Sequence, residues 1–250
     1  MDLFSLEGKY ALVTGAAQGL GQGYALAQAG AKVAILDVSP QTEAIAREMA
    51  GDTLEILGIR CNLLDRNFLK EGFRQAVEAL GGLDILINNA GIQFRGKAEE
   101  IELSDWDRLI ELNLTATFEM CQLAARQMLT QGRGGKIVNV ASMLSFFGGL
   151  NCCPYAASKG AVAQLTKALS NEWAGQGINV NAIAPGYMDT PLNTKLRAIP
   201  ERDAEITARI PAHRWGLPED LMGTIIYLCS RASDYVCGTV IPVDGGYLGR

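Results

Sequence analysis

The chain has 250 residues, 48% of them hydrophobic, and a formal net charge of −5. This length is typical of one α/β domain, and the hydrophobic content allows a large core, so the composition excludes disorder. The acidic balance and the lack of a basic block argue against nucleic acid or an anionic membrane as a partner. The segment MDLFSLEGKY lacks the basic and apolar regions of a signal peptide, and no stretch reaches membrane-spanning length. We therefore expect a cytoplasmic protein.

Short apolar runs alternate with helical patterns along the chain. We expect strands at Tyr10–Thr14, Lys32–Asp37, Leu54–Arg60, Asp84–Asn88, Lys136–Val140, Asn179–Ala184 and Thr239–Val243. We expect helices near Gly19–Ala29, Pro40–Ala50, Asp65–Leu80, Ser104–Gln131, Pro154–Gln176 and Pro218–Cys229. This alternation predicts a Rossmann-like, doubly wound parallel α/β sheet with helices on both faces, in a single domain over residues 1–250. Ligands bind such sheets outside the carboxyl ends of the strands.

A glycine-rich turn, TGAAQGLG, follows the first predicted strand. Gly15, Gly19 and Gly21 permit a tight turn and leave a helix N-terminus open for a pyrophosphate. The second apolar run, Val33 to Leu36, ends at Asp37, whose carboxylate can accept hydrogen bonds from a ribose. The spacing G-x-x-x-G-x-G differs from the generic G-x-G-x-x-G fingerprint, but strand, turn, helix, strand and acid occur in order. A dinucleotide site is favoured over an ordinary glycine-rich turn.

A tyrosine and a lysine lie four residues apart in PYAASKGAVAQLTKAL. Tyr155 and Lys159 would share one face of a helix, and Ser142 follows an upstream apolar run. A tyrosine hydroxyl has a pKa of about 10, and a nearby ammonium lowers that pKa by stabilising the phenolate. The three residues therefore predict a general acid/base whose substrate oxygen is held by a serine.

Polar and turn residues also follow later strands. Asn89, Ala90 and Gly91 follow the fourth strand, and the sixth strand ends near Pro185. The segment 187–211 is the one long stretch that the sheet does not need, and we expect it to cover the cleft as a mobile lid.

Other chemistries lack their residues. The single histidine, His213, and the absence of a G-x-S-x-G elbow exclude a common hydrolase triad, and no P-loop pattern is present. The six cysteines show no spacing suited to zinc, so we expect no metal and reduced, mostly buried thiols. Cys152 and Cys153 lie just before Tyr155, which leaves a redox-sensitive site open as the lesser alternative.

Taken together, TGAAQGLG, NNAG, VNVASM, YAASK and NVNAIAPGYMDT resemble the short-chain dehydrogenase/reductase family over essentially the whole chain. The resemblance implies hydride transfer between a nicotinamide and a carbonyl or alcohol. It implies that Tyr155 is the acid/base, that Lys159 lowers its pKa and holds the nicotinamide ribose, and that Ser142 orients the substrate oxygen. Asn113 would anchor a water that relays protons through Lys159. Asn62 stands where members of the family often carry an aspartate toward the adenine.

The implied cofactor site has residues from every predicted turn at this edge. The residues are Gly15, Gln18, Gly19, Leu20, Gly21, Asp37, Asn62, Leu63, Asn89, Ala90, Gly91, Tyr155, Lys159, Pro185, Gly186, Met188 and Thr190. Asp37 favours NAD because a carboxylate repels the 2′-phosphate of NADP. The turn itself has no Arg or Lys to neutralise that phosphate.

FSLEGK, SMLSFFGG, NEWA and RIPAHRWGLPEDLMG resemble the sugar-acid branch of the family. This closer resemblance implies interconversion of a keto group and a secondary alcohol on a small deoxy-sugar acid, by a homotetramer. An acidic substrate needs a cation, preferably a guanidinium, and Arg95 after NNAG is the best candidate. Met143 and Tyr187 are further candidate substrate contacts. Arg197, His213 and Arg214 are weaker candidates for the cation.

Three other functions stay open. Within the family, the alternatives are a gluconate 5-dehydrogenase-like polyol enzyme and a 3-oxoacyl-carrier-protein reductase. The reductase needs a basic docking surface and usually NADPH, whereas this chain is acidic and carries Asp37. A non-catalytic nucleotide-sensing protein would typically have lost part of the Ser142, Tyr155 and Lys159 set, which is complete here.

Overall fold

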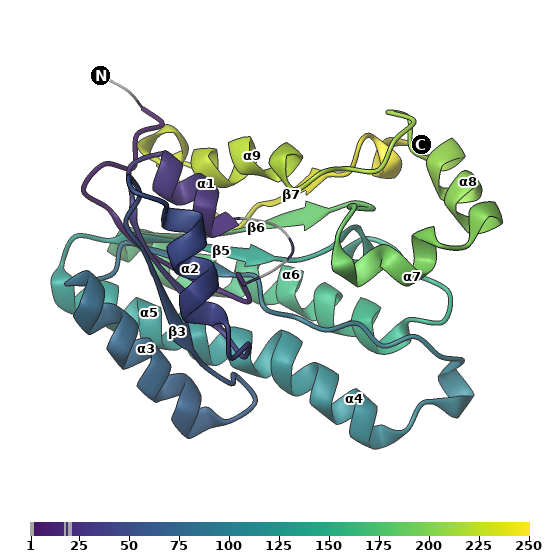
Figure 1. The fold of residues 1–250 in the computed structure, drawn as a ribbon, viewed down its shortest axis with the longest axis horizontal. Coiled ribbons are helices and arrows are strands. Elements are labelled where there is room, and N and C mark those ends of the chain that lie inside the picture. Colours follow the sequence, from purple (N-terminus) through teal and green to yellow (C-terminus); the bar gives the residue numbers. More distant parts are fainter. Residues whose placement is uncertain (1–2, 18, 20–21) are drawn as a thin grey trace.

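The protein is built on a seven-stranded sheet, seen in a computed structural model that describes residues 3–17, 19 and 22–250 (Figure 1). The strands are β1 (Tyr10–Thr14), β2 (Lys32–Asp37), β3 (Ile56–Arg60), β4 (Ile85–Asn88), β5 (Gly135–Val140), β6 (Ile178–Pro185) and β7 (Val240–Val243). Their order is β3-β2-β1-β4-β5-β6-β7, and each neighbouring pair is parallel. The strand order reverses between β1 and β4, so this is the switch point of a doubly wound sheet. The predicted fold class is confirmed.

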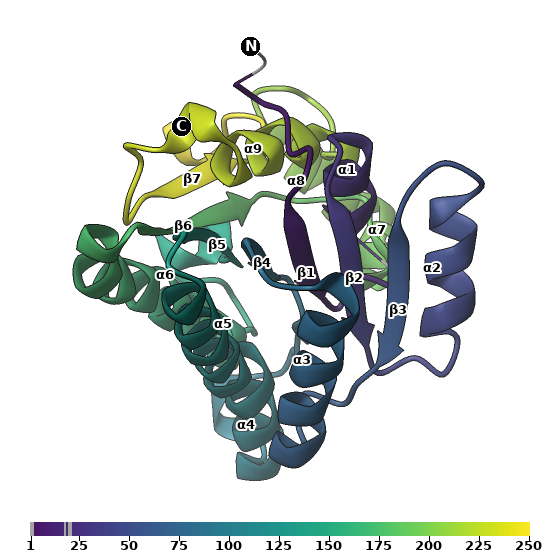
Figure 2. The same ribbon diagram turned by 90° about the vertical axis from the view of Figure 1, so that its left-hand side faces the viewer.

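Helices cover both faces of the sheet. They are α1 (Gln22–Gln28), α2 (Thr42–Ala50), α3 (Arg66–Leu80), α4 (Leu103–Ile110), α5 (Thr117–Gln131), α6 (Cys153–Trp173), α7 (Thr194–Arg197), α8 (Pro200–Arg209) and α9 (Glu219–Cys229). Figures 1 and 2 show α1 and α9 over one face and α3, α5 and α6 over the other. Each face has its own core, with Leu26 and Ile225 buried in one and Met120 and Leu169 in the other.

The central strands are apolar because both of their faces are buried. All four residues of β4 are buried, as are the last four of β1, so these strands show continuous apolar runs rather than alternation. Helix ends follow from single residues. The Asp65 carboxylate accepts hydrogen bonds from the first amides of α3 at 3.0 and 3.1 Å, and Gly81 ends that helix with a φ of 86°. A cap of this kind contributes about 1 kcal/mol.

The helix predicted near Ser104–Gln131 is present as an unbroken helical run from Leu103 to Gln131. A π-helical turn, Glu111–Ala116, interrupts the regular α-helical hydrogen bonding between α4 and α5. Asn113 in this turn exchanges hydrogen bonds with the backbone of Ile92, both at 2.9 Å. A π turn inserts one extra residue per turn and re-aims a side chain, while the apolar pattern continues through it. The sequence pattern therefore could not show the interruption.

The segment 187–211 leaves the carboxyl end of β6 and lies at the end of the sheet, at the right of Figure 1. It contains α7 and α8, and its buried Ile206 and Ile210 pack against Met143 and Trp215. These contacts place α8 beside the residues that follow β5. Within the described part of the chain, no helix is long and apolar enough to cross a membrane.

Candidate active site

A cleft of about 940 Å³ runs along the carboxyl edge of the sheet. It is lined by predicted site residues from six connections, namely Gly15, Gly19, Asp37, Asn62, Leu63, Asn89, Ala90, Gly91, Arg95, Ser142, Met143, Tyr155, Lys159, Pro185, Gly186, Tyr187, Met188 and Thr190. Gln18, Leu20 and Gly21 lie outside the described residues. The cleft lies where parallel sheets bind ligands, and it brings the nucleotide and acid/base candidates together.

The acid/base candidates meet at one point of the cleft. Tyr155 and Lys159 lie on one face of α6, and the Lys159 ammonium nitrogen is 5.7 Å from the centre of the Tyr155 ring. Lys159 is buried and donates a hydrogen bond to the Val140 carbonyl at 2.6 Å. Ser142 caps a short 3₁₀ turn, where its hydroxyl oxygen accepts from the Leu144 amide at 3.1 Å, and its side chain acts to lower the pKa of Tyr155. Backbone contacts therefore position both partners of the phenol.

Burial sets the protonation of this cluster in the protein alone. It raises the pKa of Tyr155 to about 12, against opposing effects of the Ser142 side chain and the Arg95 guanidinium. Burial also lowers the pKa of Lys159 to about 8. At neutral pH the phenol therefore keeps its proton, as a general acid must, and most of the lysine side chains are charged.

Asn113 lies directly behind the cleft wall. Its side chain is buried, exchanges the two hydrogen bonds with Ile92, and donates to the Ser158 hydroxyl at 3.2 Å. A Cβ on Gly91 would lie 3.2 Å from the Asn113 oxygen and 3.7 Å from the Lys159 nitrogen. Asn113 and Lys159 thus flank the same glycine of the NNAG motif.

Asp37 is held at the opposite end of the cleft. One carboxylate oxygen accepts from the Ala17 amide and the other from the Ser39 amide, each at 3.0 Å. Each oxygen keeps lone pairs for further donors such as ribose hydroxyls. The Asn62 oxygen accepts from the Leu64 amide at 3.1 Å, so this asparagine also fixes its own loop.

The glycine turn leaves space for a ligand backbone. Gly19 has a φ of 89°, and among the described residues no atom beyond its chain neighbours lies within 4 Å of the position its Cβ would take. Gly15 is constrained differently, because its Cβ would lie 2.6 Å from the Cα of Ala90. The Asn89 side-chain amide donates to the carbonyls of Thr14 and Gly15 at 3.0 and 2.6 Å, which ties the β4 end to the turn. These residues fit a dinucleotide lying from Asp37 to the acid/base cluster.

Arg95 lines the same cleft, where the sequence places it. With the Gln93 side-chain amide turned so that its oxygen faces Arg95, that oxygen accepts from the guanidinium, with Nε at 3.3 Å and Nη2 at 2.9 Å. The charge of Arg95 lowers the pKa of Tyr155 and of Tyr187, against the larger effect of burial. Arg95 is therefore close to the acid/base residue and to the base of the lid segment.

Three cleft residues on α8 were not anticipated from the sequence. Arg202, Glu205 and Arg209 line the same cleft, and the Arg209 guanidinium lies 4.4 Å from the centre of the Tyr247 ring. Charged residues on a short helix usually indicate a solvated face, so no pattern distinguished them. The one available signal was the position of this helix inside the lid segment.

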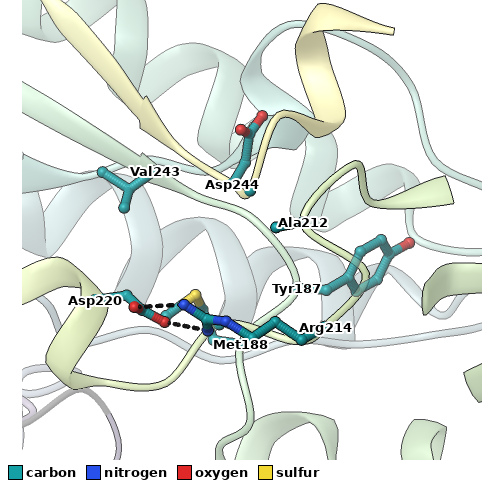
Figure 3. A pocket seen from close by; sticks show the side chains of 9 residues that line it. Tyr187, Met188, Ala212, Arg214, Asp220, Val243 and Asp244 are labelled. Carbon is teal, nitrogen blue, oxygen red and sulfur yellow. Dashed lines mark hydrogen bonds and ion pairs between the residues drawn. The ribbon is translucent and has the colours of Figure 1, made fainter. Parts of the chain in front are cut away.

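A second pocket of about 220 Å³ lies beside Tyr187 and Met188 (Figure 3). In it, Arg214 extends to Asp220 and donates two hydrogen bonds, at 2.6 and 2.8 Å. Arg197 forms an ion pair with Asp189. Neither arginine lines the main cleft, nor does His213, which is exposed. The weaker candidates for the substrate cation thus lie away from the acid/base cluster.

The cysteine and acidic side chains of the described residues were compared with the needs of a reactive thiol and of a metal site. Cys152 lines the cleft but is buried, and burial raises the pKa of its thiol, which lowers its reactivity. Cys153 is exposed. Over residues 3–17, 19 and 22–250, no group of three or more His, Cys, Asp or Glu side chains could hold a metal ion.

Comparison with known proteins shows the family of the chain. The sequence profile of a family described as Enoyl-(Acyl carrier protein) reductase matches residues 15–248. The chain belongs to the short-chain dehydrogenase/reductase family. Within that family it is 49% identical to 2-dehydro-3-deoxy-D-gluconate 5-dehydrogenase of Escherichia coli (strain K12), over 100% of this chain and 99% of that protein. Family membership makes the chain an oxidoreductase with a nicotinamide cofactor, as predicted.

Two solved structures from the same family share the fold along the whole chain. One, assigned as a 2-deoxy-D-gluconate 3-dehydrogenase from Agrobacterium tumefaciens with bound NADP, has 45% identity and a TM-score of 0.93, and covers 100% of both chains. The other is a gluconate 5-dehydrogenase from Burkholderia cenocepacia J2315 in complex with NADP and tartrate. It has 36% identity and a TM-score of 0.95, over 100% of this chain and 98% of the other. Both relatives hold NADP.

Proposed function

We propose that this dehydrogenase interconverts a keto group and a secondary alcohol on a small deoxy-sugar acid, as 2-dehydro-3-deoxy-D-gluconate 5-dehydrogenase does. The observation that carries the proposal is the convergence of Tyr155, Ser142 and Lys159 with Arg95 at one end of the cleft. The first three residues suit a carbonyl or alcohol, and Arg95 suits a carboxylate. The name of the Escherichia coli relative supports the same substrate class.

Each residue of the acid/base cluster has a separate role in the proposed reaction. The nicotinamide, when bound, supplies or accepts the hydride. Ser142 holds the substrate oxygen, and in reduction Tyr155 gives that oxygen its proton; oxidation reverses the transfer. The Lys159 ammonium stabilises the phenolate that remains. Protons return to Tyr155 through Lys159 and a water held at the Asn113 turn.

Arg95 holds the substrate carboxylate in this proposal. A guanidinium offers two parallel donors to a carboxylate, and the Gln93 amide already orients it. Met143 and Tyr187 line the wall between this cation and Tyr155. In the Arg95→Ala variant, KM for an acidic substrate rises; an unchanged KM removes Arg95 from this role.

NAD(H) is the proposed cofactor, held by the cleft residues from Gly15 to Thr190 given above. Asp37 places a negative charge near the ribose, and the turn residues Ala16, Ala17 and Gln18 include no arginine or lysine that could neutralise a 2′-phosphate. A 2′-phosphate would be repelled there. Because two relatives hold NADP, kcat/KM has to be compared for both cofactors. A higher value for NADPH than for NADH contradicts this choice.

The substrate class is tested by NADH oxidation with a panel of carbonyl compounds. The panel contains a 2,5-diketo-3-deoxygluconate-type acid, 5-keto-gluconate and an acetoacetyl thioester, each repeated with NADPH. Turnover concentrated on the deoxy-keto acid supports the proposal. Turnover concentrated on the thioester indicates an acyl reductase, and binding of NADH without turnover of any compound indicates a nucleotide sensor.

A gluconate 5-dehydrogenase-like activity is the second candidate. The Burkholderia cenocepacia relative carries that name and covers the whole of this chain at 36% identity. Both candidates use the same acid/base residues and the same cation. Relative kcat/KM for 5-keto-gluconate and the deoxy-keto acid separates them.

We also infer a homotetramer in the cytoplasm, formed by a single domain whose segment 187–211 opens and closes over the cleft. Four large apolar side chains are exposed along α3, α4 and α5, which lie on the same face of the sheet (Figure 2). They are Phe68, Leu103, Phe118 and Leu129. A surface of this kind is typical of an interface between subunits.

A further inference from the structure

The lid helix α8 presents a row of charged side chains to the cleft. Arg202, Glu205 and Arg209 occupy positions i, i+3 and i+7, which share one face of a helix, and all three line the cleft. Ile206 is buried against Met143 and its neighbours. This packing fixes the rotation of α8, so the charged row faces the cleft.

Arg202 lines the same cleft as Arg95 but belongs to a different element. Arg95 follows β4, whereas Arg202 belongs to the lid, and both line the cleft with Tyr187. The charges of both arginines act on Tyr187 and lower its pKa, against the larger effect of burial. The Tyr187 ring packs edge-on against Tyr247 at 5.5 Å. The two guanidinium groups therefore flank the same tyrosine from two different elements.

Arg202 already has an anionic partner in this structure. It forms an ion pair with Glu205, whose side chain is 67% exposed. Among the described residues, no ion pair joins Arg95 or Arg209 to an acid. Exposed ion pairs of this kind contribute little stability, so another carboxylate can replace Glu205 at low cost.

We propose that Arg202 is a second ligand of the substrate carboxylate, together with Arg95, and that Glu205 occupies Arg202 until the substrate displaces it. This inference rests on the proposed sugar-acid function. A carboxylate bound by both arginines joins the lid to the body of the protein. Acidic substrates then close the lid over Tyr155, while neutral analogues lack this connection. Arg202 and Glu205 are thus specificity-determining residues.

The test uses Arg202→Gln and Glu205→Gln in the full-length enzyme with NADH. For the deoxy-keto acid, we expect KM to rise about tenfold in Arg202→Gln, since a charge-assisted contact is lost. In Glu205→Gln we expect KM to fall about threefold, since the competing carboxylate is removed. We expect kcat to change less than KM in both. The methyl ester of the same acid should show neither shift.

A matched control is available on a remote helix. Glu71 and Arg74 on α3 form an ion pair at the same three-residue spacing, and neither lines the cleft. Glu71→Gln removes the same charge and should leave both KM values unchanged. Thermal unfolding of each variant shows that the fold is intact.

Three kinetic results overturn the inference. They are equal changes of KM for the acid and its ester in Arg202→Gln, an unchanged KM for the acid, and a higher KM in Glu205→Gln. Calorimetric titration of D-gluconate onto the enzyme–NADH complex keeps the test independent of turnover. If the wild type turns over no sugar acid, the proposed function fails. Weaker gluconate binding by Arg202→Gln than by the wild type would still support Arg202 as a carboxylate ligand. Equal gluconate affinity in both proteins, or no binding to either, overturns it.

Discussion

At the residue scale, the site depends on two ionisable groups whose pKa values are shifted in opposite directions by burial. Burial raises the pKa of the Tyr155 phenol to about 12 and lowers that of the Lys159 ammonium to about 8. Both shifts favour the neutral form. The sequence predicted that Tyr155 and Lys159 share one helix face. It did not predict their desolvation, because the burial of Lys159 beside the end of β5 arises only in the folded protein. The predicted lowering of the Tyr155 pKa by Lys159 remains a proposal.

Removing the phenol should remove the proton transfer and little else. For Tyr155→Phe, we expect kcat to fall by about 10² to 10⁴, the usual contribution of general acid/base catalysis. NADH affinity, followed by its fluorescence, should change much less. A variant that keeps more than a tenth of the wild-type kcat would show that another group supplies the proton.

Lys159 should make stability depend on pH. Its pKa is about 8 in the folded protein and 10.5 in the unfolded chain, so the unfolded chain binds more protons between these values. Stability therefore rises with pH across this window, and the cost of burying the charge is fully present below pH 8. Lys159→Met removes this dependence. The lost hydrogen bond to Val140 lowers its stability by an amount that changes little with pH.

The measurement is urea unfolding of wild type and Lys159→Met from pH 7 to 10.5. Relative to wild type, the variant should lose stability as pH rises, by an amount on the order of 3 kcal/mol over the window. A stability difference that stays constant with pH contradicts a buried, depressed lysine.

At the element scale, most site residues lie in the connections that follow the strands, and the sheet fixes the positions of these connections. Approximate strand limits and the NNAG and YAASK positions were predictable, since apolar runs and turn residues determine them locally. The π-helical turn Glu111–Ala116 and the charged face of α8 were not. The first arises from the hydrogen bonds between Asn113 and Ile92, and the second from packing of Ile206, so both depend on residues distant in the chain.

The glycine turn after β1 allows a direct test of how far local structure depends on residues distant in the chain. Gly15 and Gly8 have similar φ values of 62° and 72°, but a Cβ on Gly15 would lie 2.6 Å from the Cα of Ala90. A Cβ on Gly8 would meet no atom within 4 Å in the described part of the chain, apart from its chain neighbours. Each change to Ala costs about 1 to 2 kcal/mol for its φ. Gly15→Ala should cost about 1 to 3 kcal/mol more because of the clash. Urea denaturation of both variants measures the difference, and equal losses would show that the turn tolerates a side chain.

At the scale of the whole molecule, one acidic chain combines a nucleotide cleft with four large exposed apolar side chains on α3, α4 and α5. Phe118 is 42% exposed and Leu103 is 77% exposed in the single chain. Apolar side chains that form one contiguous patch mark an interface between proteins. The inferred tetramer makes use of these side chains, while the cleft lies at the carboxyl edge of the sheet.

Light scattering after size-exclusion chromatography should give four times the mass of one chain. Phe118→Asp should lower this mass, because a charge in an apolar interface is costly. Arg47→Asp on the exposed side of α2 is the matched control and should leave the mass unchanged. A wild-type mass of one chain at micromolar concentration contradicts the inferred assembly.

The most direct test of the central claim follows the hydride itself. NADH deuterated at the transferring position of the nicotinamide is incubated with the 2,5-diketo-3-deoxygluconate-type acid, and the product is examined by NMR. We expect one deuterium on a new carbinol carbon of the sugar acid with the wild type, and almost none in the same time with Tyr155→Phe. A sugar acid recovered without deuterium after incubation with the wild type would contradict the assignment.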